Sequence, residues 1–265
     1  MDELTDPLAV LIDADNTSPK HAGAIIDEAA KYGRPTVRRA YGDWTSTRLN
    51  GWKKQLNSRA IQPMQQFAHT SGKNSTDSAL IIDAMDLLYA GHVGGFVLVS
   101  SDSDFTRLAT RLQESGKPVY GVGGKKTPEA FQQACTQFIY TENIAEGSSD
   151  VDDTTEPGDD TEPDDDAAPA LPDLRQLLTR ALGNTAGDDG WSGLGAVGQY
   201  LGRANAAFDP RSYGHRRLSD LVKAQDFLEV RDADTTNGPI WVRVRQQPRK
   251  TSTRRSTAKK AAKKS

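Results

Sequence analysis

The sequence predicts an α/β domain with a parallel β-sheet covered by helices on both faces, followed by a small winged-helix domain. Three observations support this fold class. Apolar, β-branched or aromatic runs alternate with helical patterns over the first half of the chain. An acidic segment then interrupts the alternation, and three amphipathic helical patterns followed by two short strand patterns come after it. The chain has 265 residues, which is enough for two ordinary cores.

The first domain is expected to contain six strands, with helices in the intervals between them. Ser18 and Pro19 look like the N-cap and first position of a helix. Gly33, Gly91 and Gly116 stand where helices should end. The predicted strands are 8–13, 36–42, 60–67, 95–100, 117–122 and 137–141.

Composition divides the chain into four parts. Residues 146–170 contain Asp, Glu, Pro, Gly, Ser, Thr and Ala with almost no larger aliphatic residue, so we expect a disordered linker there. The basic, low-complexity stretch 246–265 is expected to be a disordered tail. The folded domains are then predicted at 5–145 and 171–245.

The charges are sorted along the chain. The net charge is −3, but leaving out the ten acids of residues 150–166 changes it to +7, which favours a polyanionic partner such as nucleic acid. No stretch is typical of a signal peptide or a membrane span, and a single cysteine, Cys135, excludes an internal disulfide. We therefore expect a cytoplasmic protein with no membrane partner.

Carboxylates follow two of the most apolar strands. The run "LAVLID" ends in Asp13, with Asn16 close behind it, and "GFVLVSSDSD" ends in Asp102 and Asp104. The carboxyl ends of parallel strands meet at one edge of the sheet, which is where α/β proteins bind ligands. We therefore expect these side chains to lie near one another.

A helix is predicted to bring a further carboxylate to the same edge. In "KNSTDSALIIDAMDLLYAG", Asp77 falls within roughly 20° of the centre of the apolar face that contains Leu80 and Ala84. Asp83 and Asp86 point elsewhere and are expected to be ordinary surface acids. Converging carboxylates repel one another unless a cation lies among them, and carboxylate oxygens are ligands that Mg²⁺ and Mn²⁺ prefer. Such a site suits metal-dependent cleavage of a phosphodiester.

Each of these acids also has a structural interpretation. Asp13 or Asp15 could cap the helix that follows the first strand. Asp77 could be favoured by the helix dipole, and Asp104 could be the N-cap of "FTRLATRL". The metal site explains the whole set more economically than separate roles do.

Four motifs of the first domain occur in a specific order. They are "LIDADN", "KNSTDSALIIDAMDLL", "FVLVSSDSDFTRLATRLQESGKPVYGVG" and "TPEAFQQACTQFIY". Over residues 8–144 they resemble an NYN domain, the LabA-like branch of the PIN-like nuclease superfamily. The resemblance implies a PIN-like α/β sandwich and RNA cleavage that depends on Mg²⁺ or Mn²⁺. By position, it implies metal ligands at Asp13, Asp77, Asp102 and Asp104, with Asn16 as a further residue of the catalytic site.

The second domain has the outline of a winged helix. Its details "GW..L..VG..L", "YG...L..LV" and "WVRV" resemble an OST-HTH, or LOTUS, domain over residues 171–245. The resemblance implies that this domain binds RNA and positions it for the nuclease.

Basic and aromatic residues in both domains are candidates for contacts with single-stranded or structured RNA. Cationic side chains of this kind bind phosphates with little choice of sequence, and an exposed tyrosine stacks on a base. For each residue taken singly, a solvated surface position is the simpler interpretation, and Tyr213 could equally complete the core. The candidates are Arg48, Lys53 and Lys73 in the first domain, with Ser101 as a polar helper that the resemblance implies, and Arg211, Tyr213, His215, Arg216, Arg217 and Arg243 in the second.

Two other functions fit parts of the sequence. Asp13-Ala14-Asp15-Asn16-Thr17 matches the D-x-D-x-T pattern of haloacid-dehalogenase-like phosphatases, in which the first Asp is phosphorylated. That interpretation gives Asp77 no role. A non-catalytic RNA-binding or adaptor protein is the other alternative. A homodimer and protein partners in RNA processing are also compatible with the sequence, which does not identify the RNA.

Overall fold

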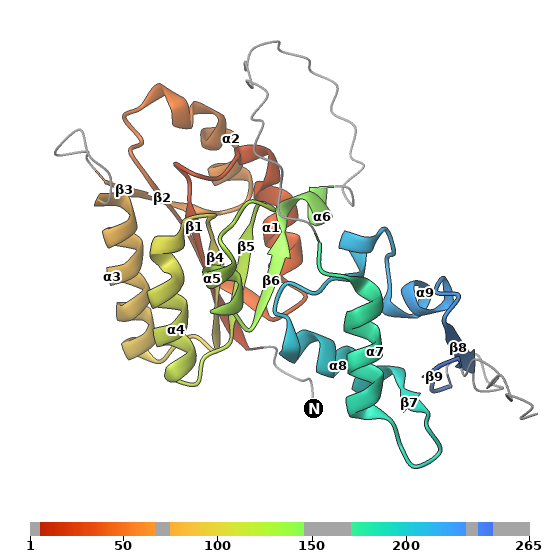
Figure 1. The fold of residues 1–265 in the computed structure, drawn as a ribbon. Coiled ribbons are helices and arrows are strands. Elements are labelled where there is room, and N and C mark those ends of the chain that lie inside the picture. The colour runs from red at the N-terminus through yellow and green to blue at the C-terminus, as the bar shows by residue number, and fades with distance from the viewer. Residues whose placement is uncertain (1–5, 67–74, 146–170, 232–237, 246–265) are drawn as a thin grey trace, which may run out of the picture.

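The computed structural model describes residues 6–66, 75–145, 171–231 and 238–245. They form two domains, a larger α/β domain and a smaller one beside it (Figure 1). None of the helices in these ranges is long and apolar enough to cross a membrane. The predicted linker and tail lie outside the described residues, as does Lys73.

A six-stranded parallel sheet forms the centre of the first domain. Each predicted strand is present, within two residues of its predicted start and end. Their order in the sheet is β3-β2-β1-β4-β5-β6. The strands are β1 (Pro7–Asp13), β2 (Arg34–Gly42), β3 (Gln62–Gln65), β4 (Gly95–Val99), β5 (Val119–Gly123) and β6 (Gln137–Tyr140).

Helices cover both faces of this sheet and enclose two cores. Val10 and Ile12 of β1 point into one core, and Ala9 and Leu11 point into the other, which is why the strand is apolar throughout. Helices α1 (Ala22–Ala29), α2 (Asn50–Ser58) and α6 (Thr141–Ala145) pack on the first core. Helices α3 (Ser75–Ala90), α4 (Thr106–Glu114) and α5 (Glu129–Gln133) pack on the second.

The direction of the strand order changes between β1 and β4. The chain passes from β1 to α1 on one face of the sheet, and from β4 to α4 on the other face. Loops that leave in opposite directions open a crevice at the carboxyl edge, which is the usual ligand site of such sheets. Ile12 is paired with Val99, so Asp13 and Ser100 are the next residues in register at that crevice.

Asp83 corrects one sequence-based expectation. It was expected to be an ordinary surface acid, but its side chain is only 18% exposed and pairs with Arg39. The hydroxyl of Tyr41 donates a hydrogen bond to the same carboxylate. Both partners come from β2, which lies beside α3, so a helical projection of α3 alone could not reveal them. Asp83 therefore attaches α3 to the sheet.

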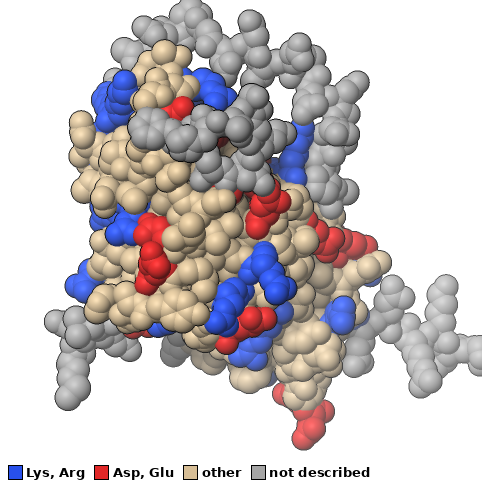
Figure 2. Space-filling model, turned by 90° about the vertical axis from the view of Figure 1, so that its left-hand side faces the viewer, with Lys and Arg blue, Asp and Glu red and all other residues tan. Residues whose placement is uncertain are grey.

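The surface on the α3 side carries both signs of charge. Figure 2 faces this side and shows Lys and Arg interspersed with Asp and Glu over α3 and its surroundings. Ile82 and Tyr89, both on α3, are the large hydrophobic side chains exposed in this helix.

The second domain has the predicted order of three helical segments and a strand pair. The third segment is divided into a 3₁₀ helix, η4 (Pro210–Tyr213), and a short helix, α9 (Leu218–Lys223), because Gly214 adopts a left-handed conformation with φ of 79°. A two-residue strand, β7 (Ser192–Gly193), is paired with β9 and was not predicted. The remaining elements are α7 (Leu174–Thr185), α8 (Leu194–Ala204), β8 (Leu228–Arg231) and β9 (Trp241–Val244).

Candidate active site

Asp13 is the most deeply buried acid at the carboxyl edge of the sheet. It is the last residue of β1 and is 0% exposed. Its carboxylate accepts hydrogen bonds from the Asn16 side-chain amide at 2.8 Å, from the Asn16 N–H at 3.3 Å and from the Ser100 hydroxyl at 2.9 Å. Burial raises the pKa of Asp13 above its usual range, although these hydrogen bonds oppose the shift. Asp13 is thus a fixed, partly desolvated carboxyl group.

The loop after β4 supplies Asp102 and Asp104. Asp102 is the N-cap of the 3₁₀ helix η3 (Ser103–Phe105), and its carboxylate accepts the Asp104 N–H at 2.9 Å. The capping role considered for Asp104 therefore belongs to Asp102. The cap holds one oxygen of Asp102 and turns the chain so that Asp104 follows on the exposed side.

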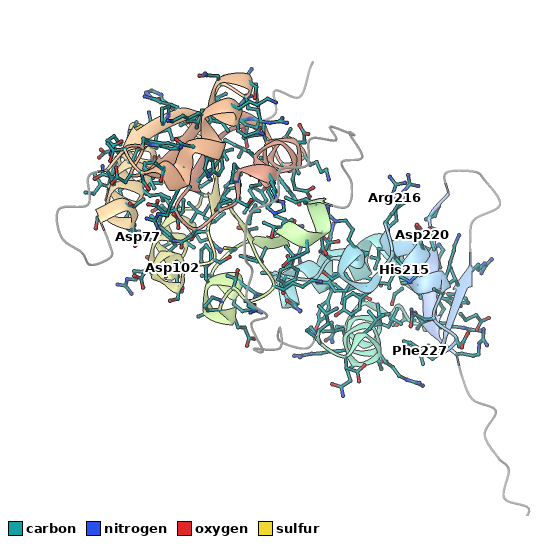
Figure 3. All side chains as sticks on the ribbon, turned by 90° about the horizontal axis from the view of Figure 1, so that it is seen from above. Asp77, Asp102, His215, Arg216, Asp220 and Phe227 are labelled. Carbon is teal, nitrogen blue, oxygen red and sulfur yellow. The ribbon has the colours of Figure 1, made fainter. Side chains whose placement is uncertain are left out.

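Asp77 joins these acids from the first turn of α3. One carboxylate oxygen from each of Asp77, Asp102 and Asp104 lies within 4.8 Å of the others. Figure 3 shows Asp77 and Asp102 next to each other at this edge of the first domain. Burial, together with the charges of Asp13 and the neighbouring aspartates, raises the pKa of Asp77 to about 6. The structure thus brings three of the four predicted aspartates together, while Asp13 lies deeper and is linked to Asp102 through Ser100.

The donor set fits a hard divalent cation. All the side chains concerned offer carboxylate oxygens, which suit Mg²⁺ and Mn²⁺. Within the described ranges, no Lys or Arg forms an ion pair with any of the four aspartates. Burial and, after it, the charges of the neighbouring aspartates raise the pKa of Asp77, and a bound cation would relieve this repulsion.

Asn16, Asp15 and Ser101 connect the loops around the acids. Both nitrogens of Asn16 donate to Asp13, so Asn16 orients that carboxylate. Asp15 accepts a hydrogen bond from the Thr76 hydroxyl at 3.1 Å, which ties the loop after β1 to α3. The Ser101 hydroxyl accepts the Gly124 N–H at 3.0 Å, which ties the loop after β4 to the loop after β5.

Ser100 is the residue of this site that the sequence reasoning missed. It is 2% exposed, donates to Asp13, and accepts the Asp102 N–H at 3.1 Å. It therefore links the buried acid to Asp102, which is only partly exposed. Its place directly after β4, in register beside Asp13, was the available signal, because a hydroxyl buried at such a position needs a partner.

A groove of about 210 Å³ adjoins the acid cluster between α3 and α4. Asp104 belongs both to the cluster and to the lining of the groove. Arg107 and Arg111 are four residues apart on α4 and so share one side of that helix. Apolar lining comes from Ile81 and Met85 of α3. The groove thus combines an apolar wall with two arginines, of which Arg111 is paired with Glu114 of the same lining at 3.9 Å.

The RNA-binding candidates of the second domain lie apart from the acid cluster (Figure 3). His215, Arg216 and Arg217 occupy the turn between η4 and α9, where the two arginines are exposed. Arg243 is paired with Glu229 at 2.7 Å and stacks on the Trp191 ring, whose centroid lies 4.4 Å from the guanidinium carbon.

Of the remaining RNA-binding candidates, some make contacts within the protein and others are exposed. The Tyr213 hydroxyl donates to the Pro172 carbonyl at 3.0 Å. Arg211 forms ion pairs with Glu28 and Asp209. In the first domain, Arg48 lies in the 3₁₀ helix η2 (Thr47–Leu49) and Lys53 in α2, and both side chains are exposed.

Comparison with known proteins gives a family for each domain. A family model described as the NYN domain matches residues 7–144, and one described as the OST-HTH/LOTUS domain matches residues 170–240. No curated protein is a significant match to the chain.

Solved structures give partial likenesses to the chain. A protein of unknown function from Vibrio parahaemolyticus is 17% identical, with 53% of this chain and 95% of that chain covered and a TM-score of 0.45. A solution structure from Chromobacterium violaceum is 35% identical, with 32% and 92% covered and a TM-score of 0.25. Another, from Nitrosomonas europaea, is 28% identical, with 37% and 94% covered and a TM-score of 0.27.

Proposed function

The chain belongs to the NYN domain family, of the PIN-like nuclease superfamily, and an OST-HTH/LOTUS domain follows its NYN domain; we propose that it is a metal-dependent ribonuclease. The family supports an RNA-directed hydrolase in general terms. The finer proposal is that this chain cleaves RNA phosphodiesters at the crevice between β1 and β4 with Mg²⁺ or Mn²⁺.

The observation that carries the proposal is the group formed by Asp77, Asp102 and Asp104. They come from two elements that are separate in the sequence, α3 and the loop after β4, and their oxygens approach within 4.8 Å without a basic partner among the described residues. Holding three carboxylates this close is unfavourable unless a proton or cation compensates. A resident divalent ion accounts for the arrangement.

Each acid has a distinct part in the proposal. Asp77, Asp102 and Asp104 would hold the ion, which when bound supplies a more acidic water and neutralises charge on the phosphodiester. Asp13 lies deeper and adds negative charge that acts on Asp77, as the raised pKa of Asp77 reflects. Asn16 and Ser100 keep the Asp13 carboxylate in one orientation.

The groove between α3 and α4 offers a path for the RNA strand next to the acids. Arg107 and Arg111 are placed to contact successive phosphates, and the apolar wall at Ile81 and Met85 suits the faces of bases. RNA held by the exposed basic residues of the OST-HTH domain, Arg216 among them, would be retained while the strand enters this groove.

A phosphatase that uses Asp13 as its nucleophile is disfavoured by the burial of that residue. An attacking carboxylate must reach the phosphorus atom, but Asp13 is 0% exposed and accepts hydrogen bonds at both oxygens. The same geometry suits a supporting acid in a metal site.

The proposal is tested by incubating the purified full chain with labelled single-stranded RNA and Mn²⁺ or Mg²⁺. Wild type should cut the RNA, and Asp77→Asn or Asp102→Asn should reduce the rate by about 100-fold or more, since each removes a charged ligand. Asp102→Asn keeps a side chain that can cap η3. Asp86→Asn, at an exposed acid of the same helix α3, is the matched control and should cut at the wild-type rate. Equal cutting by all four proteins, or binding without cutting, would refute the proposal; the second result would favour a non-catalytic RNA-binding protein.

A further inference from the structure

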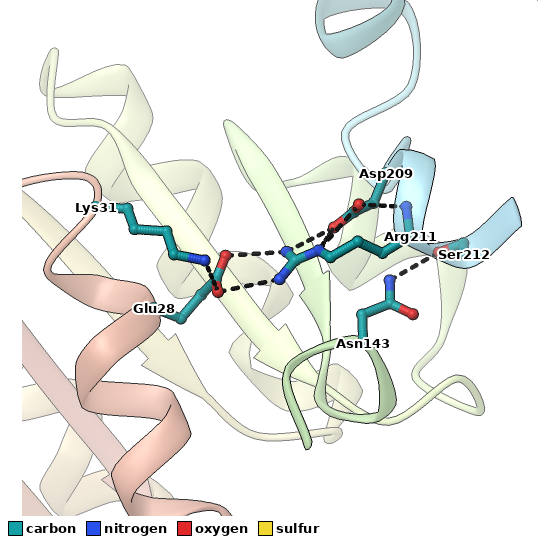
Figure 4. Close-up of polar contacts among 6 residues, drawn as sticks. All are labelled: Glu28, Lys31, Asn143, Asp209, Arg211 and Ser212. Atoms are coloured by element: carbon teal, nitrogen blue, oxygen red, sulfur yellow. Dashed lines mark hydrogen bonds and ion pairs between the residues drawn. The ribbon is translucent and has the colours of Figure 1, made fainter. Parts of the chain in front are cut away.

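A buried carboxylate of the first domain is paired with an arginine of the second. Glu28 lies on α1, and its side chain is 5% exposed. Arg211 of η4 donates from Nη2 to Oε1 at 2.9 Å and from Nη1 to Oε2 at 3.1 Å. Figure 4 shows this two-fold contact between α1 and η4.

The Glu28 contact is part of a larger charged group. Lys31, in the turn that follows α1, approaches Glu28 at 2.6 Å, and Asp209, the N-cap of η4, approaches the Arg211 guanidinium at 2.7 Å. Each domain therefore contributes an acid and a base. Burial alone would raise the pKa of Glu28, but the hydrogen bonds from Arg211 and Lys31 outweigh it and hold that pKa below its usual range.

The arginine is the partner that this burial requires. A carboxylate removed from water is costly unless it is paired and hydrogen-bonded, and a guanidinium matches a carboxylate with two parallel hydrogen bonds. Lys31 reaches only one oxygen of Glu28, while Arg211 reaches both. Without the second domain, Glu28 would keep a single partner.

Three other contacts surround the ion pairs. The Phe138 N–H of β6 donates to the Ala206 carbonyl at 2.8 Å, so the second domain covers an edge of the sheet that would otherwise offer unpaired backbone groups. The Asn143 side-chain amide donates to the Ser212 hydroxyl at 2.8 Å. Ala207 packs against the core that α3, α4 and α5 share.

Packing between the domains is incomplete around these contacts. Cavities of about 310 Å³ and 390 Å³ are lined by residues of both domains. Gln132 and Tyr213 line the first, and Thr136 and Phe208 line the second. The interface therefore depends on a few directed polar contacts, as is usual for contacts between domains of one chain.

We propose that Glu28, Asn143 and the outer edge of β6 form a docking surface for residues 206–212 of the same chain, and that Arg211 is a positioning residue that holds the OST-HTH domain there. Sequence alone placed Arg211 among the RNA contacts, but its guanidinium is directed to Glu28 and Asp209. We then expect the exposed arginines that follow it, Arg216 and Arg217, to contact the RNA.

Docking would also determine where a bound RNA is cut, an inference that rests on the proposed nuclease function. A fixed domain arrangement sets the distance between RNA bound near Arg216 and the acid cluster at Asp77 and Asp102 (Figure 3). The bound strand would then be cut at a defined spacing from its attachment point, because the reacting group is held in place by the scaffold.

The docking is tested without RNA or metal, by hydrogen exchange of the full chain. The Phe138 amide reports directly on the contact, since its acceptor is Ala206. Arg211→Gln and Glu28→Gln should each accelerate its exchange by about tenfold or more, and Arg211→Lys should have a smaller effect. The control is Arg180→Gln, which changes an exposed basic residue of α7 that has no ion pair to another described residue. Its Phe138 amide should exchange at the wild-type rate.

Three results would overturn the docking proposal. One is exchange of the Phe138 amide at the wild-type rate in both Arg211→Gln and Glu28→Gln. Another is faster exchange of the buried α7 amides near Leu178 in Glu28→Gln, which would mean unfolding of the second domain rather than release. A third is protection of Phe138 that disappears on dilution, which would assign the contact to two copies of the chain.

The positioning role has a second readout in the cleavage products. Wild type should give a narrow range of product lengths from an RNA with one high-affinity attachment site, and Arg211→Gln a broad range at a similar total rate. Unchanged product lengths, in a variant whose Phe138 exchange is accelerated, would refute the positioning role while leaving docking intact. Because hydrogen exchange needs no activity, failure of the nuclease proposal is distinguishable from failure of docking.

Discussion

The hydroxyl of Ser100 donates a hydrogen bond to the carboxylate of Asp13 at 2.9 Å, and so joins the ends of β1 and β4. The same hydroxyl accepts the Asp102 N–H at 3.1 Å. One side chain thus fixes the buried acid relative to the segment after β4 that carries Asp102 and Asp104. The geometry of the acid cluster depends on this residue although it carries no charge.

Ser100→Ala should therefore impair both stability and cleavage. The substitution leaves one buried oxygen of Asp13 with fewer donors and removes the acceptor of the Asp102 N–H, which should cost about 1–3 kcal/mol of unfolding free energy. Urea denaturation measures this loss, and cleavage at saturating RNA should fall because the loop after β4 is less well placed. Ser103→Ala, a change of the same size at an exposed position of η3, is the control. Equal effects of the two substitutions would contradict the assigned role.

Asp77 should make the stability of the metal-free protein fall as the pH rises. Its pKa is raised from 3.8 to about 6 in the folded state, so between these values the folded protein holds a proton that the unfolded chain has released. Stability contributed by that proton is present below pH 4 and is lost as the pH rises through 6. Asp77→Asn removes the effect, so the variant should be more stable than wild type at pH 7, by roughly 1 kcal/mol after screening by solvent.

Thermal melts in EDTA at pH 4, 5, 6 and 7 would measure this pH dependence. The difference between Asp77→Asn and wild type should grow with pH and level off above about pH 6. A difference that is constant over this range would show that Asp77 does not titrate as described.

Mn²⁺ should stabilise the folded protein through the same acids. A ligand that binds only the folded state at 100 times its dissociation constant adds about 2.7 kcal/mol to stability. Wild type should therefore melt at a higher temperature in Mn²⁺ than in EDTA. Asp102→Asn should lose most of this increase in melting temperature, and Asp86→Asn should retain it. A gain of equal size in Asp102→Asn would place the ion elsewhere.

Arg107→Gln should weaken RNA binding at the groove beside Asp104. Loss of one phosphate contact lowers the affinity and reduces the slope of log affinity against log salt concentration by about 0.7 for a single strand. The KM for RNA should rise while kcat changes little. Fluorescence anisotropy at several salt concentrations measures the slope, with Arg180→Gln as the control. An unchanged slope would exclude Arg107 from the RNA path.

The fold and the acid cluster could be predicted because their signals are local. Each strand of the parallel sheet is a short apolar run, and its end is marked in the sequence by the polar residues that follow, as at Asp13 and Asp102. The inward position of Asp77 follows from helical geometry alone. Once strands alternate with helices, the carboxyl ends must gather at one edge, so convergence of these acids needed no tertiary information.

Contacts between distant residues could not be predicted in this way. Asp83 is paired with Arg39 across 44 positions of sequence, and Arg211 with Glu28 across 183. Helical projection showed Asp83 off the apolar face but not that β2 passes beside it. Composition marked Arg211 as basic, and nothing local distinguishes an arginine that binds a phosphate from one that binds a carboxylate.

The most direct test of the acid cluster as a catalytic metal site is a titration with Mn²⁺ in which ion binding and RNA cleavage are measured on the same samples. Bound Mn²⁺ is measured by electron paramagnetic resonance, and cleavage by the initial rate at saturating RNA. The account predicts one half-saturating Mn²⁺ concentration for both signals in wild type and in Asp86→Asn, and a large increase in both for Asp77→Asn. Cleavage that persists in EDTA, or Mn²⁺ binding that Asp77→Asn leaves unchanged, would contradict it.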